Sequence, residues 1–255
     1  MDHYQKMTST TKNRFRKIII AIIWLMLWQI MASLIKEEIL LPSPLLVFKS
    51  FTSLLGQVAF YKTILTSTIK ILVGFIISIA IGTIFAYLSY RYKLFYDFIS
   101  PIIRVFRSIP LASIVIFLLF WADKSLLSIY VSFIMAMPLI FQNLYDGLES
   151  IDRKILEMAD VYKVSEIKKI RYIYKVKAKY FLYSSIISVS GLVFKAGIAA
   201  EVIGLPQNSI GNNLYNAKVY LDMPNLFAWT ISILLISSIF EYMLKRFLGV
   251  DYARI

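Results

Sequence analysis

Long apolar runs alternate with short polar segments along the chain, and the runs predict helices that cross a membrane. A helix needs about 20 apolar residues to span the hydrocarbon core of a bilayer. Three runs approach or reach this length without a charged residue, at 18–35, 71–90 and 126–145. In the first of them, Trp24 and Trp28 suit anchoring at a membrane interface.

Three further spans are predicted from interrupted runs. The run 109–122 is too short alone, so that helix must reach back to Pro101. Lys195 interrupts the run 180–200, and Glu241 lies near the end of the run 226–244. Six spans is the best count, and the alternative is five, with the first or the third span peripheral.

Composition agrees with the membrane class and narrows the chemistry. The chain is 59% hydrophobic and only 17% charged, whereas a soluble domain carries about 25% charged residues. Cysteine is absent, which excludes disulfides, thiol nucleophiles and Cys-based metal sites. His3, the single histidine, stands in a polar N-terminal tail, which argues against imidazole catalysis.

The distribution of Lys and Arg predicts how the chain is oriented. Cytoplasmic loops of membrane proteins are enriched in these residues. The segment 146–179 holds nine of them, and further ones cluster before 18, after 90 and after 244. Both termini and the segment 146–179 are therefore expected to be cytoplasmic in a multi-pass protein of the cell membrane. The net charge of +13 is then explained by topology, without nucleic-acid binding.

We find no repeats and no linkers, so we expect one transmembrane domain over 18–248, between tails at 1–17 and 249–255. The N-terminal apolar run is too long for a cleavable signal peptide, and no small-residue cleavage site follows it.

The segment 146–179 predicts two short helices with a bend between them. Ile155, Met158, Ala159 and Tyr162 recur at i, i+3, i+4 and i+7, which is an apolar stripe on a helix. Ser165 is placed to cap a second helix with Glu166 in its first turn. Such a pair suits docking to another protein, and the alternative is packing against the chain's own cytoplasmic face.

Several catalytic motifs are missing. No G-x-x-x-x-G-K-[ST] occurs, so the chain has no phosphate-binding loop with which to hydrolyse ATP. H-E-x-x-H, G-x-S-x-G and EF-hand patterns are also absent from the sequence. We predict no catalytic residue, no metal site and no cofactor bound by this chain, so energy must come from a partner subunit or an ion gradient.

Lys195 is the most expensive residue to place in a membrane. Intramembrane charges usually face a bundle interior or a water-filled cavity. One interpretation is a snorkelling Lys195 and an interfacial Glu201. The other is that Lys195 borders a translocation path and meets an anion or a carboxylate there. Glu201 and Pro110 would then also belong to the path, and Gly191 would allow close helix approach. Pro110 kinks or breaks the third span, and a broken helix lining a cavity is its functional interpretation.

The cytoplasmic segment resembles the signature of binding-protein-dependent ABC importer permeases, which reads Glu-Ala-Ala, then Gly, then Ile-x-Leu-Pro. Here Glu157, Met158 and Ala159 take the first three places, and Ile173 takes the Ile. Lys163 stands in place of Gly, and Lys175-Val176 in place of Leu-Pro. The segments LPSP (41–44), FRSIPLAS (106–113) and FKAGIAAEVIGLP (194–206) are similar to nitrate/sulfonate/taurine-type permeases, and the resemblance covers roughly residues 15–248.

The resemblance implies an all-α integral membrane protein of about six spans, with a cytoplasmic coupling hairpin between spans four and five. It implies that the chain is a transport subunit for a small polar or anionic solute. The implied partners are a second permease copy, two ATPases that bind ATP and Mg, and an extracytoplasmic binding protein. The implied coupling residues are Glu157, Met158, Ala159, Tyr162, Lys163, Val164 and Ser165.

In this implied docking, Glu157 faces a basic group of the ATPase while the apolar side chains fill its groove. A positive φ at Lys163 would be costly. The alternatives are a coupling subunit of a vitamin importer that works without a binding protein, and an intramembrane enzyme or scaffold.

Overall fold

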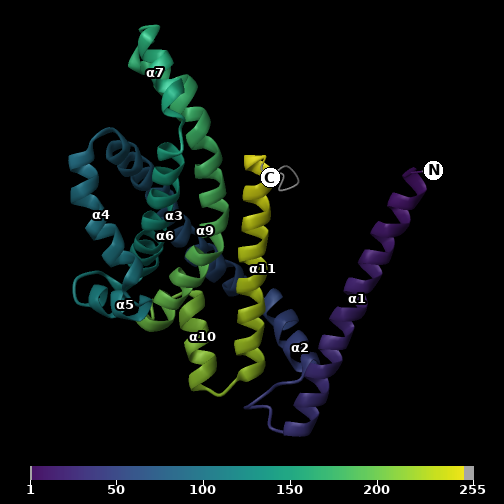
Figure 1. Cartoon of the computed structure of the whole chain (residues 1–255). Coiled ribbons are helices and arrows are strands. Elements are labelled where there is room, and N and C mark those ends of the chain that lie inside the picture. Colours follow the sequence, from purple (N-terminus) through teal and green to yellow (C-terminus); the bar gives the residue numbers. More distant parts are fainter. Residues whose placement is uncertain (1, 250–255) are drawn as a thin grey trace. The chain divides into compact units, whose positions relative to one another are not determined.

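The computed structural model describes the backbone of residues 2–249 and the side chains of residues 15–249. Residues 250–255 of the predicted C-terminal tail, and most side chains of the predicted N-terminal tail, lie outside the described part. Every regular element within that part is a helix (Figure 1), and the all-α prediction is confirmed.

The elements follow one another in the chain as α1 (Asp2–Ile35), α2 (Pro44–Leu55), α3 (Val58–Arg91), α4 (Lys93–Ser108), α5 (Leu111–Leu119), the 3₁₀ turn η1 (Lys124–Leu126), α6 (Leu127–Glu149), α7 (Arg153–Val161), α8 (Glu166–Lys169), the π turn η2 (Ile170–Tyr174), α9 (Lys175–Gly204), α10 (Ile210–Val219) and α11 (Met223–Leu248).

Within the part of the chain that the structure describes, five helical segments are long and apolar enough to cross a membrane, and a bent pair makes a sixth if it is counted as one span. The five are Phe15–Ile35, Val58–Arg91, Lys124–Glu149, Glu166–Gly204 and Met223–Leu248. This agrees with the predicted six spans and with the alternative of five.

The third predicted span is the bent pair. Helices α4 and α5 meet at an angle of 101°, so 101–122 is not one straight helix. Pro110 is the N-cap residue of α5 and has no N–H to continue α4. The residue before it, Ile109, has extended backbone, as is usual before proline. The break expected at Pro110 is therefore present.

The second predicted span is longer than the apolar run that predicted it. Helix α3 begins at Val58 and has 34 residues, so it contains Lys62 and Lys70. Lysine is a good helix former, and its long stem allows the ammonium to reach polar surroundings. The apolar run identified the span, but a charge at its edge did not mark the helix end.

The second helix of the predicted hairpin is not a separate element. The short α8 continues through the π turn η2 directly into α9. Ser165 lies at the predicted N-cap position, yet its side chain makes no capping hydrogen bond. The hairpin therefore has α7 as one arm and the extended start of the fifth span as the other.

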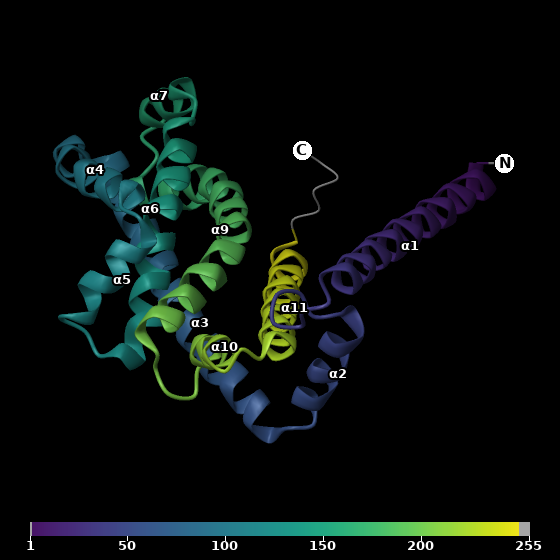
Figure 2. The ribbon, with the colours of Figure 1, turned by 90° about the horizontal axis from the view of Figure 1, so that it is seen from below.

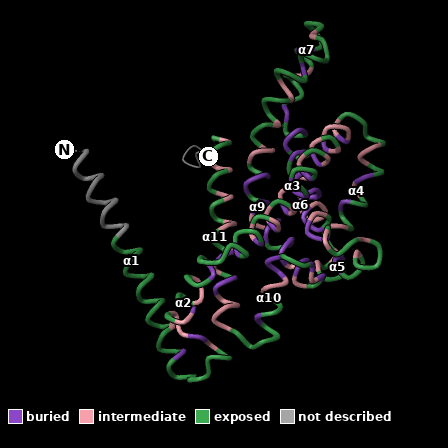
Figure 3. Tube along the Cα trace, turned by 180° about the vertical axis from the view of Figure 1, so that it is seen from behind, coloured by how far each residue is buried: buried purple, intermediate pink, exposed green. Residues whose placement is uncertain are grey.

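The chain divides into two compact units, 1–60 with 214–232 and 61–213 with 233–255. In the first unit, Ser43 caps α2 and Pro44 occupies its first turn, which explains the LPSP segment. The indole N–H of Trp28 donates to the carbonyl of Pro42 at 3.0 Å. Helix α1 is exposed along almost all of its apolar length (Figure 3), as lipid-facing helices are.

In the second unit, α6 and α9 pack along one another (Figure 2), and both are rich in buried residues. The close approach of α3 to these two helices depends on glycine at two points. A Cβ on Gly74 would lie 2.3 Å from the carbonyl oxygen of Ile129 in α6. A Cβ on Gly197 would lie 2.5 Å from Ile71 in α3. Small residues at such contacts are typical of membrane helices.

Candidate functional site

Helix α7 is a short helix that the sequence caps at both ends. The carboxylate of Asp152 accepts the Lys154 N–H at 2.9 Å and satisfies a donor of the first turn. At the other end, Val164 N–H donates to the Ala159 carbonyl and Lys163 N–H to the Asp160 carbonyl, each at 2.9 Å. This pair of bonds is the Schellman motif, which ends a helix with one left-handed residue.

Lys163 is that left-handed residue, with φ of 51°. The family signature has Gly at this place, and the bend does require the conformation that Gly adopts freely. The Lys Cβ makes the same backbone less favourable by about 1 kcal/mol. The bend is therefore held against the local cost that was expected for a positive φ at Lys163.

The hairpin exposes an apolar ridge on α7. Met158 is 56% exposed, Val161 78% and Tyr162 76%. Ala159, which the resemblance placed in the docking surface, is only 6% exposed and packs inside this chain. The ridge that a partner can reach consists of Met158, Val161 and Tyr162, together with Ile155, and this set is called the α7 ridge below.

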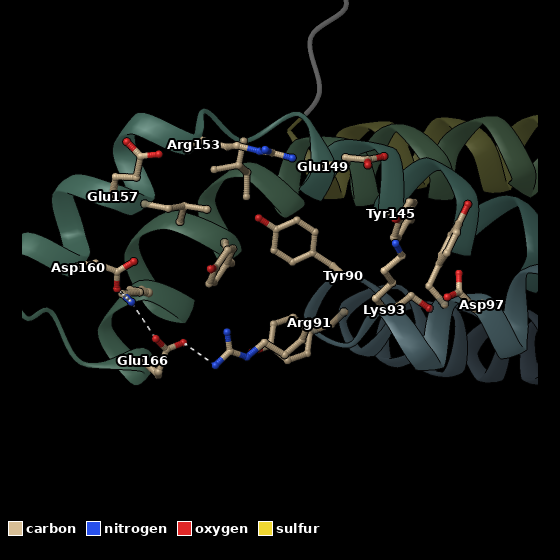
Figure 4. A pocket seen from close by; sticks show the side chains of 17 residues that line it. Tyr90, Arg91, Lys93, Asp97, Tyr145, Glu149, Arg153, Glu157, Asp160 and Glu166 are labelled. Carbon is tan, nitrogen blue, oxygen red and sulfur yellow. Dashed lines mark hydrogen bonds and ion pairs between the residues drawn. The ribbon is translucent and has the colours of Figure 1, made fainter.

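A chain of ion pairs holds the two arms of the hairpin together (Figure 4). Lys169 is buried, and its ammonium contacts Asp160 of α7 and lies 2.8 Å from Glu166. Glu166 in turn pairs with Arg91, at the end of α3, at 3.7 Å. The arms are thus joined to each other and to a membrane span. Lys169 was not singled out from the sequence, although its i, i+3 spacing from Glu166 was a signal for an ion pair on a helix.

Beside these ion pairs lies a cavity of about 830 Å³ between the hairpin and the ends of α3, α4 and α6 (Figure 4). Glu157 is exposed and lines this cavity from α7. Charged residues of both signs and several tyrosines share the lining, and Tyr96 stacks on Tyr145 with ring centroids 4.5 Å apart. No cluster of His, Asp or Glu suited to a metal ion occurs among the described residues.

Glu201 is not at an interface with water, and its carboxylate lies inside the second unit. It is 0% exposed. Its Oε2 accepts the hydroxyl of Ser67 (α3) at 2.9 Å and the N–H of Gly211 (α10) at 3.1 Å. Its Oε1 accepts the hydroxyl of Ser128 (α6) at 2.9 Å. The interpretation of Glu201 as an interfacial residue is therefore wrong. Its side chain does not lie on a surface that a solute reaches in this conformation.

Lys195 lies on an exposed side of α9, away from the buried Glu201. The exposed side chains there are small or polar, and space is open around Gly191. Ser184, Ser188 and Lys195 are exposed at helical spacing, while their neighbours Val193, Phe194 and Ala196 are buried. A lipid-facing surface is normally apolar, so this stripe fits polar surroundings better than it fits lipid. Lys195 and Gly191 therefore share one face, and Glu201 does not belong to it.

Ser67 and Ser128 were not singled out from the sequence. Each is a serine within an apolar helix, and such residues most often bond to their own backbone, as Ser78 and Ser190 do here. The available signal was the carboxylate itself, because a buried charge must find donors. Which donors it finds depends on three helices that are far apart in sequence.

The family described as "Binding-protein-dependent transport system inner membrane component" matches residues 78–248. A probable ABC transporter permease protein of Brucella melitensis biotype 1 is 24% identical over 196 residues, which covers 76% of this chain and 79% of that protein. The Bacillus subtilis (strain 168) protein named "Putative aliphatic sulfonates transport permease protein SsuC" is 21% identical over 210 residues, covering 80% of this chain and 75% of that one.

Proposed function

Because the chain belongs to the family of binding-protein-dependent transport system inner membrane components, we propose that it forms the translocation path of an ATP-driven importer. It is a multi-pass membrane protein and the permease component of an ABC transporter. The working complex we propose contains two copies of this chain, two ATPase subunits that bind ATP and Mg, and an extracytoplasmic binding protein that delivers the solute.

The α7 ridge is the observation that carries the proposal. Its four large apolar side chains are exposed on a short charged helix. Adjoining exposed apolar side chains of this kind mark a surface that binds a partner. We propose that the ridge fills an apolar groove of the ATPase, and that Glu157 meets a basic group beside it. Charge pairs of this kind fix the register of a contact more than its strength.

Each chain has one α7 ridge, whereas a pair of ATPase subunits has two docking grooves, one on each subunit. A homodimer of this chain supplies both, which is why we propose two identical copies. A purified complex with one copy of this chain beside a different permease chain would contradict the homodimer.

The proposed orientation follows from the Lys and Arg residues. With 146–179 and both termini on the cytoplasmic side of the cell membrane, the ridge faces the ATPases and the segment 205–225 faces outward. A reporter inserted in each segment measures this. Cytoplasmic activity from the outer segment would contradict the orientation.

We propose an anionic solute, on the support of Lys195 and of the sulfonate named for the Bacillus subtilis relative. An ammonium on the small-residue face of α9 offers an anion a favourable site along the path. Lys195→Met is expected to lower uptake of aliphatic sulfonates or similar anions in cells while leaving ATPase co-purification unchanged. Uptake equal to wild type would remove Lys195 from the path.

A further inference from the structure

The first turn of α10 is capped by two other helices. The first N–H groups of any helix lack partners within it. Here the Ile210 N–H donates to the hydroxyl of Ser67 at 3.0 Å, and the Gly211 N–H donates to Glu201 at 3.1 Å. Only the third, from Asn212, is capped locally, by Ser209 at 3.1 Å. The start of α10 is therefore fastened to α3 and α9 through its own backbone.

Glu201 is at the centre of the contacts that join the start of α10 to α3, α6 and α9, and this set of contacts is called the junction below. The Ser67 hydroxyl oxygen accepts the Ile210 N–H, and the hydroxyl proton is donated to Oε2 of Glu201. The same oxygen also accepts the Gly211 N–H, so both backbone N–H groups depend on it. The other oxygen binds Ser128 of α6. Helices α3, α6 and α10 thus meet at one side chain of α9, and its three hydrogen bonds lie within the second compact unit.

Gly211 makes the junction tight. A Cβ at this position would lie 2.4 Å from the Cβ of Glu201 and 2.4 Å from the Val202 nitrogen. These are backbone-level contacts that a side-chain rotation does not relieve. Any residue larger than Gly pushes the first turn of α10 away from α9 even when the Glu201 carboxylate is intact.

A buried carboxylate is a poor way to gain stability. Replacing a buried charge with an apolar side chain of similar size is often neutral or stabilising. An apolar side chain at position 201 would not provide the directional hydrogen bonds that Glu201 makes to the α10 backbone. Their loss leaves the Gly211 N–H buried without an acceptor unless the turn moves.

We propose that Glu201 is a positioning residue for transport, whose carboxylate fixes the first turn of α10 to α3, α6 and α9 so that they move together. Under the proposed orientation, this junction lies on the outer side, at the opposite end of α9 from the α7 ridge (Figure 1). The inference rests on the proposed transport function. It adds that Glu201 acts through hydrogen bonds and contacts no solute.

Two variants separate hydrogen bonding from packing. Glu201→Leu keeps the volume and removes every bond. Glu201→Gln keeps all three, because its amide oxygen accepts from Ser67 and Gly211, while its NH₂ donates to Ser128 once that hydroxyl reverses. Gly211→Ala is the third variant, which displaces the turn without changing Glu201, and Ser128→Ala removes one of the three bonds.

The experiment measures uptake per assembled transporter, basal ATP hydrolysis and the position of α10. The chain has no cysteine, so Asn212→Cys gives one thiol whose rate of modification by a membrane-impermeant reagent reports on the first turn. Glu201→Leu leaves three buried donors without an acceptor, and Gly211→Ala pushes the first turn of α10 away from α9. Each is therefore expected to lower uptake by about tenfold or more. Both should speed modification and leave basal hydrolysis intact. Glu201→Gln should stay near wild type, and Ser128→Ala, which loses only the bond to α6, should lie between Glu201→Gln and Glu201→Leu.

Each result decides the question. Normal uptake and slow modification in both Glu201→Leu and Gly211→Ala would overturn the positioning role, and so would loss of uptake in Glu201→Gln, which would indicate a need for the charge. If Glu201→Leu does not fold, Gly211→Ala and Glu201→Gln still give opposite expectations. An absence of ATP-driven uptake by the wild-type transporter would instead count against the proposed function.

Discussion

Lys169 and Glu201 are both buried charges, at opposite ends of the same helical segment, and they are satisfied in different ways. The Lys169 side chain is 8% exposed and meets two carboxylates, on side chains that are 67% and 50% exposed. Glu201 is 0% exposed and meets two serine hydroxyls and one backbone N–H.

The difference indicates what each end is suited to do. Ion pairs that water reaches are weak, screened by salt and easily rearranged, which suits a hairpin that docks and moves. Hydrogen bonds from neutral donors in a dry interior are directional, and breaking them is costly, which suits a rigid junction. The docking end is therefore expected to tolerate loss of its charges better than the junction tolerates loss of its bonds.

The largest effect at the docking end should come from the apolar ridge. Met158→Asp puts an unpaired carboxylate where the ATPase groove removes water, and we expect weaker ATPase binding by about 2 kcal/mol or more. The measurement is co-purification of the ATPase in detergent across a series of ATPase concentrations.

Met158→Leu is the matched control, because it keeps an apolar side chain of similar size. It should bind the ATPase as the wild type does. Equal binding by Met158→Asp would remove the α7 ridge from the interface.

An intermediate effect is expected at the ion pairs, where the chain offers two adjacent lysines. Lys169→Met removes the cation between Asp160 and Glu166 and leaves Glu166 paired with Arg91 alone. It should loosen the hairpin, measured as faster amide hydrogen exchange over 160–166. Lys168→Met removes an exposed lysine and should have little effect. Equal exchange in the two variants would mean that Lys169 does not join the arms.

The smallest effect is expected at the bend, and it has the opposite sign. Lys163→Gly removes the Cβ from a residue with positive φ and should stabilise the hairpin by about 1 kcal/mol, with ATPase binding kept. The midpoint of thermal unfolding in detergent measures it. A lower midpoint would show that the Lys163 side chain makes contacts that outweigh the backbone cost.

Much of the fold was readable from the sequence because bilayer crossing imposes a length and a composition on each helix. The spans at 126–145 and 180–200 correspond to α6 and α9, and the break at Pro110 follows from a missing N–H. The sequence did not predict the 101° angle, since its size depends on packing around α4 and α5. It also did not predict that α8 runs into α9, because the lysine-rich stretch 175–179 separates the apolar positions of 166–174 from the apolar run of the span.

The candidate sites were readable in part. The position of the hairpin and of its bend follow from local spacing, and Lys163 was noticed because it replaces a Gly. That Ala159 faces inward and Val161 outward depends on how α7 is rotated against the rest of the chain, which the stripe alone left open. The partners of Glu201 come from residues 67, 128 and 211, and only the packed fold brings these together.

The central claim is that the α7 ridge docks on an ATPase, and cross-linking tests it most directly. Val161→Cys introduces a single thiol on the ridge of a cysteine-free chain, and Asn216→Cys introduces one on α10, in the segment 205–225 that is proposed to face outward. A short bifunctional reagent applied to membranes that hold the assembled transporter should join Val161→Cys, and not Asn216→Cys, to the ATPase. An ATPase cross-link from Asn216→Cys, with none from Val161→Cys, would contradict the account.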